Sequence, residues 1–396
     1  MKIAYIALTR GNLSGGSRKH LRKMVPLLRS HPDVERVDVF VPPQVLHDGS
    51  SEFLEFLGVP RRGATRGTPR NHPRHSEELR DARTWPENDE LFGFRELRRS
   101  LAALKPDVLF IPTARVLRVP GIPVVTMVRN MEPLEVPFGG NAISEGLKNV
   151  ARAVTARRAC RASDRVIAVS HHVRKFLVDR WRIPEQRIGT VYHGIDPAGE
   201  ERVNAPAFAA SLDGSRFLFT AGSIRPARGL EDVIEALSEV PADVQLVIAG
   251  SVDSGAEPYR ARLDRLAEER GVTSRIVWAG QLDATAMSWC FRHATHFVMT
   301  SRAEACPNTV LEAMAHGAVS ISTDHQPMPE FFTDAAIYYR ERDGVDLSHR
   351  LSVALALTPE QREQIRERAI ARARQFTWES TARATVDELR RAIEND

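Results

Sequence analysis

Residues 296–323 read HFVMTSRAEACPNTVLEAMAHGAVSIST and contain the pattern that decides the fold. A short apolar run ends near Thr300, and Pro307 then opens a helix, because proline suits a first turn that has no use for its missing N–H. Gly317 ends this helix, and a second apolar run follows at 318–322. Strand, helix and strand in this order predict a parallel β-α-β unit.

The same alternation extends outward in both directions and is typical of an α/β protein with doubly wound parallel sheets. In the first half, strands are expected at 2–8, 36–41, 107–112, 123–128, 165–169 and 189–192, and helices at 16–30, 90–104, 144–162 and 171–181. In the second half, strands are expected at 216–221, 244–249, 275–279, 296–300, 318–322 and 336–339, and helices at 229–239, 257–270, 284–293 and 308–316. The two halves are alike in plan.

We therefore expect two domains, at 1–196 and 216–376, separated by a Pro- and Gly-containing linker with little periodicity. A final helix at 377–396 has a candidate N-cap, Thr377, and an apolar stripe that needs a surface to cover.

An insertion at 58–86 departs from the alternation, because RRGATRGTPRNHPRH (61–75) holds five arginines and no apolar period. It predicts a long loop or a partly disordered segment. Two interpretations of this segment stay open. It is either a cationic lid over an anionic ligand or a solvated insertion, and runs of charged residues are more often solvated.

Composition narrows the class of protein. The chain has 396 residues, 42% hydrophobic and 27% charged, which excludes a small disulfide-stapled scaffold and global disorder. Cys160, Cys290 and Cys306 are widely spaced and odd in number, as expected in a reducing compartment. The 55 basic and 51 acidic residues leave a net charge of +4, which permits anionic partners without naming one.

The first apolar run, within MKIAYIALTRGNLSGG (1–16), is too short for a signal sequence or a membrane span. We therefore expect a soluble, cytoplasmic protein, with peripheral contact at the inner membrane surface left open.

Two glycine-containing turns between a strand and a helix could approach a ligand. The first holds Gly15 and Gly16, and the helix that it opens carries His20 and a basic flank. Paired glycines allow close backbone approach, and a helix start offers N–H groups, but many such turns bind nothing. The second turn, Gly222-Ser223-Ile224-Arg225-Pro226-Ala227-Arg228, places two guanidinium groups where open α/β sheets bind ligands, and these suit diphosphate oxygens.

The loop and helix at 300–317 carry two carboxylates, Glu304 and Glu312, eight residues apart. They would flank the positive end of the helix, where a phosphate can sit between backbone N–H groups while the acids accept hydrogen bonds from hydroxyls. A capped helix with no ligand is the alternative.

The ordered set of motifs resembles the retaining, GT-B fold, nucleotide-sugar glycosyltransferases of glycosyltransferase family 4. The strongest element is the E-x7-E pattern of Glu304 and Glu312. The supporting segments are the SGG turn with His20, VIAVSHHVRKFL, VYHGID, AGSIRPARGLEDVIEAL, LVIAG, IVWAGQLD and QFTWESTA. The resemblance covers most of the chain and implies two facing Rossmann-like domains, an acceptor-binding one and a nucleotide-sugar-binding one. It also implies a final helix that crosses back to the first domain.

The resemblance implies a role for each matching residue. Glu312 would hold the ribose hydroxyls and Glu304 the donor sugar, while Arg228 and Arg225 would stabilise the leaving diphosphate. The donor would also contact the two turns and the helix start, at Gly15, Gly16, Gly222, Ser223, Cys306, Pro307, Asn308, Thr309 and Val310.

Several positions depart from the pattern of the family. In VVTMVRNMEPLE, Arg129 and Asn130 stand where many relatives have a histidine facing the sugar, so Asn130 is the catalytic-side candidate, and Arg129 and His20 are acceptor-side candidates. Ser223 stands for a frequent arginine, His193 for an asparagine, and HQPMPE lacks the usual glycines before Glu330. The chain has no Asp-x-Asp, which agrees with a mechanism that uses no metal or other cofactor.

The predicted function is transfer of a sugar from a nucleoside diphosphate to a hydroxyl of a polysaccharide, a glycolipid or a natural product, in carbohydrate biosynthesis. Nucleic acid is not an expected partner. The alternatives are a nucleotide-sugar epimerase or phosphorylase of the same fold, and a non-catalytic binder of anionic polymers or membranes that uses residues 61–75.

Overall fold

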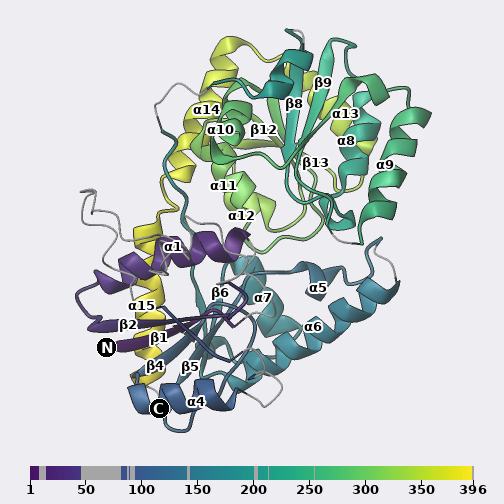
Figure 1. Cartoon of the computed structure of the whole chain (residues 1–396). Coiled ribbons are helices and arrows are strands. Elements are labelled where there is room, and N and C mark those ends of the chain that lie inside the picture. The colour runs from purple at the N-terminus through teal and green to yellow at the C-terminus, as the bar shows by residue number, and fades with distance from the viewer. Residues whose placement is uncertain are drawn as a thin grey trace, which may run out of the picture.

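Two parallel sheets, one in each half of the chain, form the framework of the molecule (Figure 1). The computed structural model describes residues 1–8, 15–45, 82–86, 89, 94–140, 143–199, 204–212, 214–253 and 255–394. The first sheet has the order β3-β2-β1-β4-β5-β6-β7 and the second the order β10-β9-β8-β11-β12-β13. Each order runs outward in both directions from the first strand of its half, which is the doubly wound plan predicted from the sequence.

The first sheet is flanked by helices from the same half of the chain. Its strands are β1 (Lys2–Ile6), β2 (Arg36–Val41), β3 (Arg83–Thr84), β4 (Val108–Ile111), β5 (Val124–Val128), β6 (Arg165–Ala168) and β7 (Ile188–Thr190). Its helices are α1 (Gly15–Arg29), α4 (Arg95–Leu104), α5 (Glu132–Glu135), α6 (Ile143–Ala162) and α7 (His171–Asp179). All five residues of β5 are buried, as expected where helices cover both faces of a parallel sheet.

The second sheet repeats this plan. Its strands are β8 (Arg216–Ala221), β9 (Val244–Ala249), β10 (Ile276–Gly280), β11 (His296–Met299), β12 (Ser320–Thr323) and β13 (Ala336–Tyr339). Its helices are α8 (Leu230–Leu237), α9 (Glu257–Glu269), α10 (Ala284–His293), α11 (Asn308–Ala315), α12 (Met328–Phe332), α13 (Gly344–Leu355) and α14 (Pro359–Ala373). β8 and β9 pair in parallel from Arg216 opposite Val244 to Ala221 opposite Ala249.

The last helix, α15 (Trp378–Glu394), packs against α1 and against β4, β5 and β6 of the first sheet (Figure 1). Its first turn is capped by Thr377, whose Oγ1 accepts a hydrogen bond from the Ser380 N–H at 3.1 Å. The chain thus passes between the two sheets twice, and the two passages touch where the Ile195 N–H donates to the Phe376 carbonyl at 2.9 Å.

The end of the predicted insertion differs from the expectation. Arg83–Thr84 form β3 and pair in parallel with β2, and Trp85 is buried, so these residues belong to the sheet instead of a loop. One exposed polar strand of two residues gives no periodic signal, which is why the sequence did not predict it. The arginine-rich part, 61–75, lies outside the described residues. Within the described part of the chain, no helix is both long enough and apolar enough to span a bilayer.

Candidate active site

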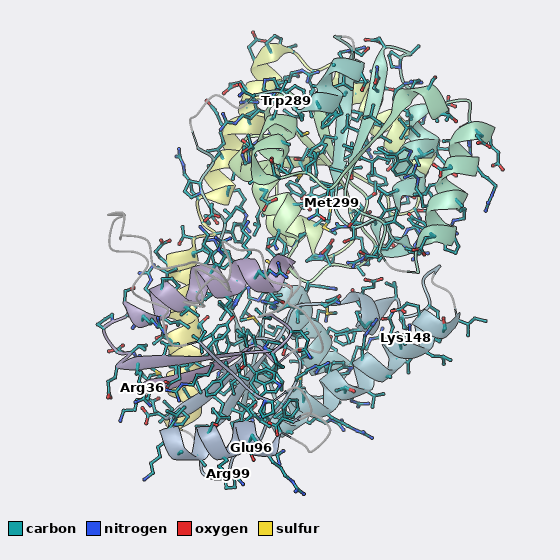
Figure 2. The ribbon with its side chains drawn as sticks, in the orientation of Figure 1. Arg36, Glu96, Arg99, Lys148, Trp289 and Met299 are labelled. Carbon is teal, nitrogen blue, oxygen red and sulfur yellow. The ribbon has the colours of Figure 1, made fainter. Side chains whose placement is uncertain are left out.

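The two candidate loops of the second half lie side by side, because β8 and β11 are neighbouring parallel strands. Figure 2 places Met299, the last residue of β11, at the side of the upper domain that faces the lower one. The Arg302 N–H donates to the Ala227 carbonyl at 2.8 Å, and the Thr300 hydroxyl donates to the Arg228 carbonyl at 2.7 Å. These bonds fix the arginine-containing turn against the loop that carries Glu304.

Arg228 reaches from its turn to Glu304. Its Nη1 donates to Glu304 Oε1 at 2.8 Å and to the Ser301 hydroxyl at 2.9 Å. The backbone of Gly222, with φ of 137°, allows the guanidinium to lie on the turn, since a Cβ there would overlap the guanidinium carbon. The two side chains are only 15% and 16% exposed, and Arg228 Nε is buried without a hydrogen-bond partner among the described residues. The site therefore holds a buried guanidinium with unused donor capacity.

Glu312 faces the opposite domain. It lies on α11, and its Oε1 is 2.8 Å from Lys19 Nζ on α1, with both side chains about a quarter exposed. Figure 1 shows α1 directly below α11 and α12. The second acid of the pair is thus held by an ion pair between the domains, 293 residues apart in the chain.

Arg225 also pairs across the domains. Its Nε lies 3.1 Å from Glu132 Oε2 on α5, and its Nη1 lies 3.2 Å from Asp253 Oδ2. Burial raises the pKa of Glu132, an effect that Arg225 opposes and the carboxylates of Asp253 and Glu304 reinforce. Glu132, Arg225, Arg228 and Glu304 therefore form one coupled group of charges at the domain boundary.

His20, Arg129 and His193 form a second polar group, which belongs to the first domain. His20 is 1% exposed and its Nδ1 lies 2.9 Å from the Tyr5 hydroxyl, while Arg129 Nη2 donates to the Ser17 hydroxyl at 2.8 Å. Burial lowers the pKa of His20 well below its usual value and that of His193 to about 3, and the nearby Arg129 charge adds to both shifts. Both imidazoles are neutral at pH 7, and His20 cannot touch an acceptor directly in this conformation.

The remaining candidates are spread around these groups. Gly16 is exposed at the start of α1, and Ser223 is half-buried in the turn before Arg225. Asn130 is exposed, and its Oδ1 accepts a hydrogen bond from the Glu132 N–H at 3.1 Å, so it shapes the loop that carries Glu132. Gly15 is the first residue of α1.

At the start of α11, the groups available to a ligand belong mainly to the backbone and not to side chains. Pro307 precedes the helix, Asn308 and Thr309 are partly exposed, and burial raises the pKa of the Cys306 thiol to about 12, so this thiol is not a nucleophile at neutral pH. Val310 is fully buried, and its N–H donates to the Pro307 carbonyl at 3.1 Å. Neither its side chain nor its N–H is therefore available to a bound nucleotide sugar. The predicted phosphate cradle is thus limited to 306–309.

Comparison with known proteins shows to which family the chain belongs. Residues 36–198 match the model of Glycosyltransferase Family 4, and residues 204–372 match the model of Glycosyl transferases group 1. The chain belongs to the family 4-like glycosyltransferases. This glycosyltransferase is 26% identical over 254 residues to the D-inositol 3-phosphate glycosyltransferase of Mycobacterium leprae, a match that covers 61% of the chain and 58% of the relative.

Solved structures resemble the whole glycosyltransferase. Anabaena HepE in complex with UDP-glucose has a TM-score of 0.72 at 14% identity, over 99% of this chain and 100% of that chain. Sucrose-phosphate synthase from Thermosynechococcus elongatus has a TM-score of 0.70 at 18% identity, over 100% of this chain and 99% of that chain. These likenesses confirm the GT-B fold that the resemblance implies.

Two cavities of this glycosyltransferase are lined by residues of both domains, and none of the four residues of the charged group lines either of them. A cavity of about 700 Å³ is lined by Glu135 and Arg157 from the first domain and by Arg302 and His325 from the second. A smaller one, about 250 Å³, is lined by residues that include Ala227 and Gly140. The turn before Arg228 therefore borders open space between the domains.

The sequence did not single out Glu132, and it offered Lys19 only as part of the basic flank of the first helix, although both touch predicted site residues. Glu132 stands two residues after Asn130 in RNMEPLE, so a charged residue next to a predicted site position was the available signal. Glu330, noted only as part of an altered motif, accepts hydrogen bonds from the His171 and His172 N–H groups at the start of α7, at 2.7 and 3.0 Å. These three side chains connect the domains.

Proposed function

We propose that this glycosyltransferase transfers a sugar from a nucleoside diphosphate sugar to an acceptor hydroxyl, with retention of anomeric configuration and without a divalent metal. The observation that carries the proposal is the buried Arg228, which is held by Glu304 and Ser301 and still has a buried, unpartnered Nε. A guanidinium with free donors in a water-poor site suits diphosphate oxygens, which accept in pairs.

In the proposed reaction, the bond between the anomeric carbon and the diphosphate oxygen breaks as a bond to the acceptor oxygen forms. The acceptor proton passes to the departing diphosphate. Arg228, with Arg225 beside it, stabilises the negative charge that develops on the leaving group, as preorganised donors do in water-poor active sites. The N–H groups of Cys306, Asn308 and Thr309 add to this at the helix start.

The two acids would position the donor. Glu312 would accept hydrogen bonds from the ribose, for which it must release Lys19, and Glu304 would contact the sugar while remaining bonded to Arg228. Because the pair Lys19–Glu312 is partly exposed, its loss costs no more than about 1 kcal/mol, which a bound nucleotide can offset.

The relatives supply the first substrates to test. Anabaena HepE is described in complex with UDP and with UDP-glucose, so uridine nucleotides are the first donors. The Mycobacterium leprae relative is named for D-inositol 3-phosphate, so a polyol phosphate is the first acceptor.

Thermal unfolding in the presence of UDP, GDP, ADP and TDP, and of their sugars, tests the proposal. A ligand at 100 times its Kd stabilises the native state by about 2.7 kcal/mol, so one nucleotide should raise the melting temperature clearly. The variants Arg228→Ala and Glu312→Gln should lose this shift. Arg216→Ala is the matched control, because Arg216 forms an exposed ion pair with Asp243 in the same domain.

Product analysis completes the test. With the stabilising donor and an acceptor, NMR should show the donor's anomeric configuration in the product, and EDTA should leave the rate unchanged. An epimerised sugar formed without acceptor would show an epimerase instead. If no nucleotide changes the melting temperature, the proposal is wrong.

A further inference from the structure

The described part of the chain exposes few large apolar side chains, and most of them gather on one helix. Five of the seven lie on α6 or in the loop before it, and we call them the α6 apolar stripe: Phe138, Ile143, Leu147, Val150 and Val154. Ile143 is 77% exposed and Leu147 is 61% exposed. Contiguous apolar surface of this kind marks an interaction site more often than single exposed residues do.

The spacing makes the stripe continuous. Steps of four, three and four residues from Ile143 to Val154 keep these side chains on one side of the helix. Phe138 joins them because its ring lies on Gly146, where a Cβ would overlap the ring. The opposite side of α6, with Asn149, Ala156 and Cys160, is buried against the domain. The helix therefore has one apolar face turned inward and a second turned to solvent.

The charged residues of α6 are mostly basic. The helix carries five basic residues and one acidic residue, a net charge of 5 − 1 = +4: Lys148, Arg152, Arg157, Arg158, Arg161 and Glu145. Lys148 and Arg152 pair with Glu145, but these pairs are exposed and weak. Figure 2 shows Lys148 on α6, toward the outer edge of the lower domain.

We propose that the α6 apolar stripe docks the protein on an anionic membrane surface. Apolar side chains would enter the boundary between headgroups and acyl chains. Arg158 next to the stripe, and the exposed long side chains of Lys148 and Arg152 farther round the helix, would approach lipid phosphates. A second copy of the chain is a poorer occupant, because two copies of a helix with net charge +4 repel each other. The inference does not depend on the proposed function.

The chain offers an internal comparison. The other two exposed apolar residues, Val345 and Val353, lie on α13 of the second domain, 67% and 59% exposed. On α13 they accompany one aspartate, Asp346, and one arginine, Arg350, so there is no positive field around them. If exposed apolar side chains were sufficient for membrane binding, α13 would bind membranes as α6 does.

Docking on α6 would also orient the cleft. α6 packs on α5, which carries Glu132 of the charged group, and a Cβ at Gly140 would lie 3.1 Å from Pro226 in the arginine-containing turn. The membrane would then lie next to the domain boundary.

Co-sedimentation with vesicles tests this inference. Wild-type protein should bind vesicles of phosphatidylcholine with one third phosphatidylglycerol, and should bind pure phosphatidylcholine and high-salt samples more weakly. The double variant Leu147→Glu with Val150→Glu should lower the partition coefficient by about tenfold or more. The double variant Val345→Glu with Val353→Glu should bind as wild type does. Because all four positions are exposed, circular dichroism should show unchanged folding.

A second pair of substitutions keeps the test decisive. Lys148→Gln with Arg158→Gln leaves the apolar residues intact and should reduce binding to the anionic vesicles only. No binding by wild type, equal losses in the α6 and α13 variants, or concentration-dependent dimers that the α6 variant abolishes without vesicle binding would each overturn the proposal.

Discussion

His20 and His193 are two neutral imidazoles in one buried polar group. Their ring centroids are 5.6 Å apart, and each ring lies close to Trp378. A protonated histidine here would lose its hydration and face the positive charge of Arg129, which is why burial and Arg129 together lower both pKa values. The group therefore stabilises the native state only while it stays uncharged.

We predict that stability falls in acid because of this group. The pKa of His193 is about 3 in the native state and about 6.5 when unfolded, so its contribution is complete above pH 6.5 and is lost as the pH falls toward 3. Within this window the protonation of His193 costs about 1.4 kcal/mol per pH unit. Urea unfolding at several pH values should show a shallower dependence in His193→Asn. His349→Asn, at an exposed histidine, should keep the wild-type slope, and a wild-type slope in His193→Asn would contradict the prediction.

The sequence predicted the site residues that meet within one domain. It did not predict the pairs that form between the two domains. Glu304 and Arg228 were found because each follows a strand, and their strands are neighbours, so the sheet brings them together. The meetings of Lys19 with Glu312 and of Glu132 with Arg225 depend on how the two domains are placed, which no local pattern records. The roles of all these residues in catalysis stay predictions until variants are measured.

The bounds of β2, β8, β9 and β13 were predicted to the residue, and those of the fully buried strands β4, β5, β6, β11 and β12 to within two residues. α13 and α14 were not predicted from the sequence. α14 is mostly polar and buries only Ile365, Ala369 and Ala373, so its apolar period is weak. The capping box of Thr358 and Gln361 is nevertheless a sequence pattern that predicts a helix N-terminus. α5 and α12 have four and five residues, too few for a period.

Arg165 of β6 and Glu388 of α15 form the buried pair that attaches the last helix to the first sheet. Arg165 Nη2 lies 2.6 Å from Glu388 Oε2, and the side chains are 8% and 6% exposed. We predict that Glu388→Ala destabilises the protein by about 3–5 kcal/mol, because it leaves the guanidinium buried without its partner. The double variant Arg165→Met with Glu388→Met should recover most of the loss, as urea unfolding can show. A double variant no better than Glu388→Ala would mean that packing, not charge, explains the effect.

At the scale of the whole molecule, polar contacts between described residues hold the domains face to face, and three of these contacts involve the carboxylates of Glu312, Glu132 and Glu330. These three are Lys19 with Glu312, Arg225 with Glu132, and Glu330 with the start of α7. The third is directional, since one carboxylate accepts from two backbone N–H groups and from the Tyr192 hydroxyl at 2.7 Å. A carboxylate at a helix N-terminus also interacts favourably with the helix dipole. Glu330 therefore accepts three hydrogen bonds from the first domain.

We predict that Glu330→Ala opens the domains. The N–H groups of His171 and His172 would lose their acceptor, and water can replace it fully only if the domains separate. Small-angle scattering should give a larger radius of gyration for Glu330→Ala than for wild type, with Glu330→Gln intermediate because its amide oxygen still accepts one bond. The matched control is Glu363→Ala, because Glu363 is exposed and pairs with Arg366 within α14 of the second domain. If closure positions the proposed donor, a saturating nucleotide should restore the compact form, since ligand binding favours the state that binds it. Identical scattering from wild type and Glu330→Ala would mean that the other contacts and the chain crossing at Ile195 and Phe376 suffice to fix the arrangement.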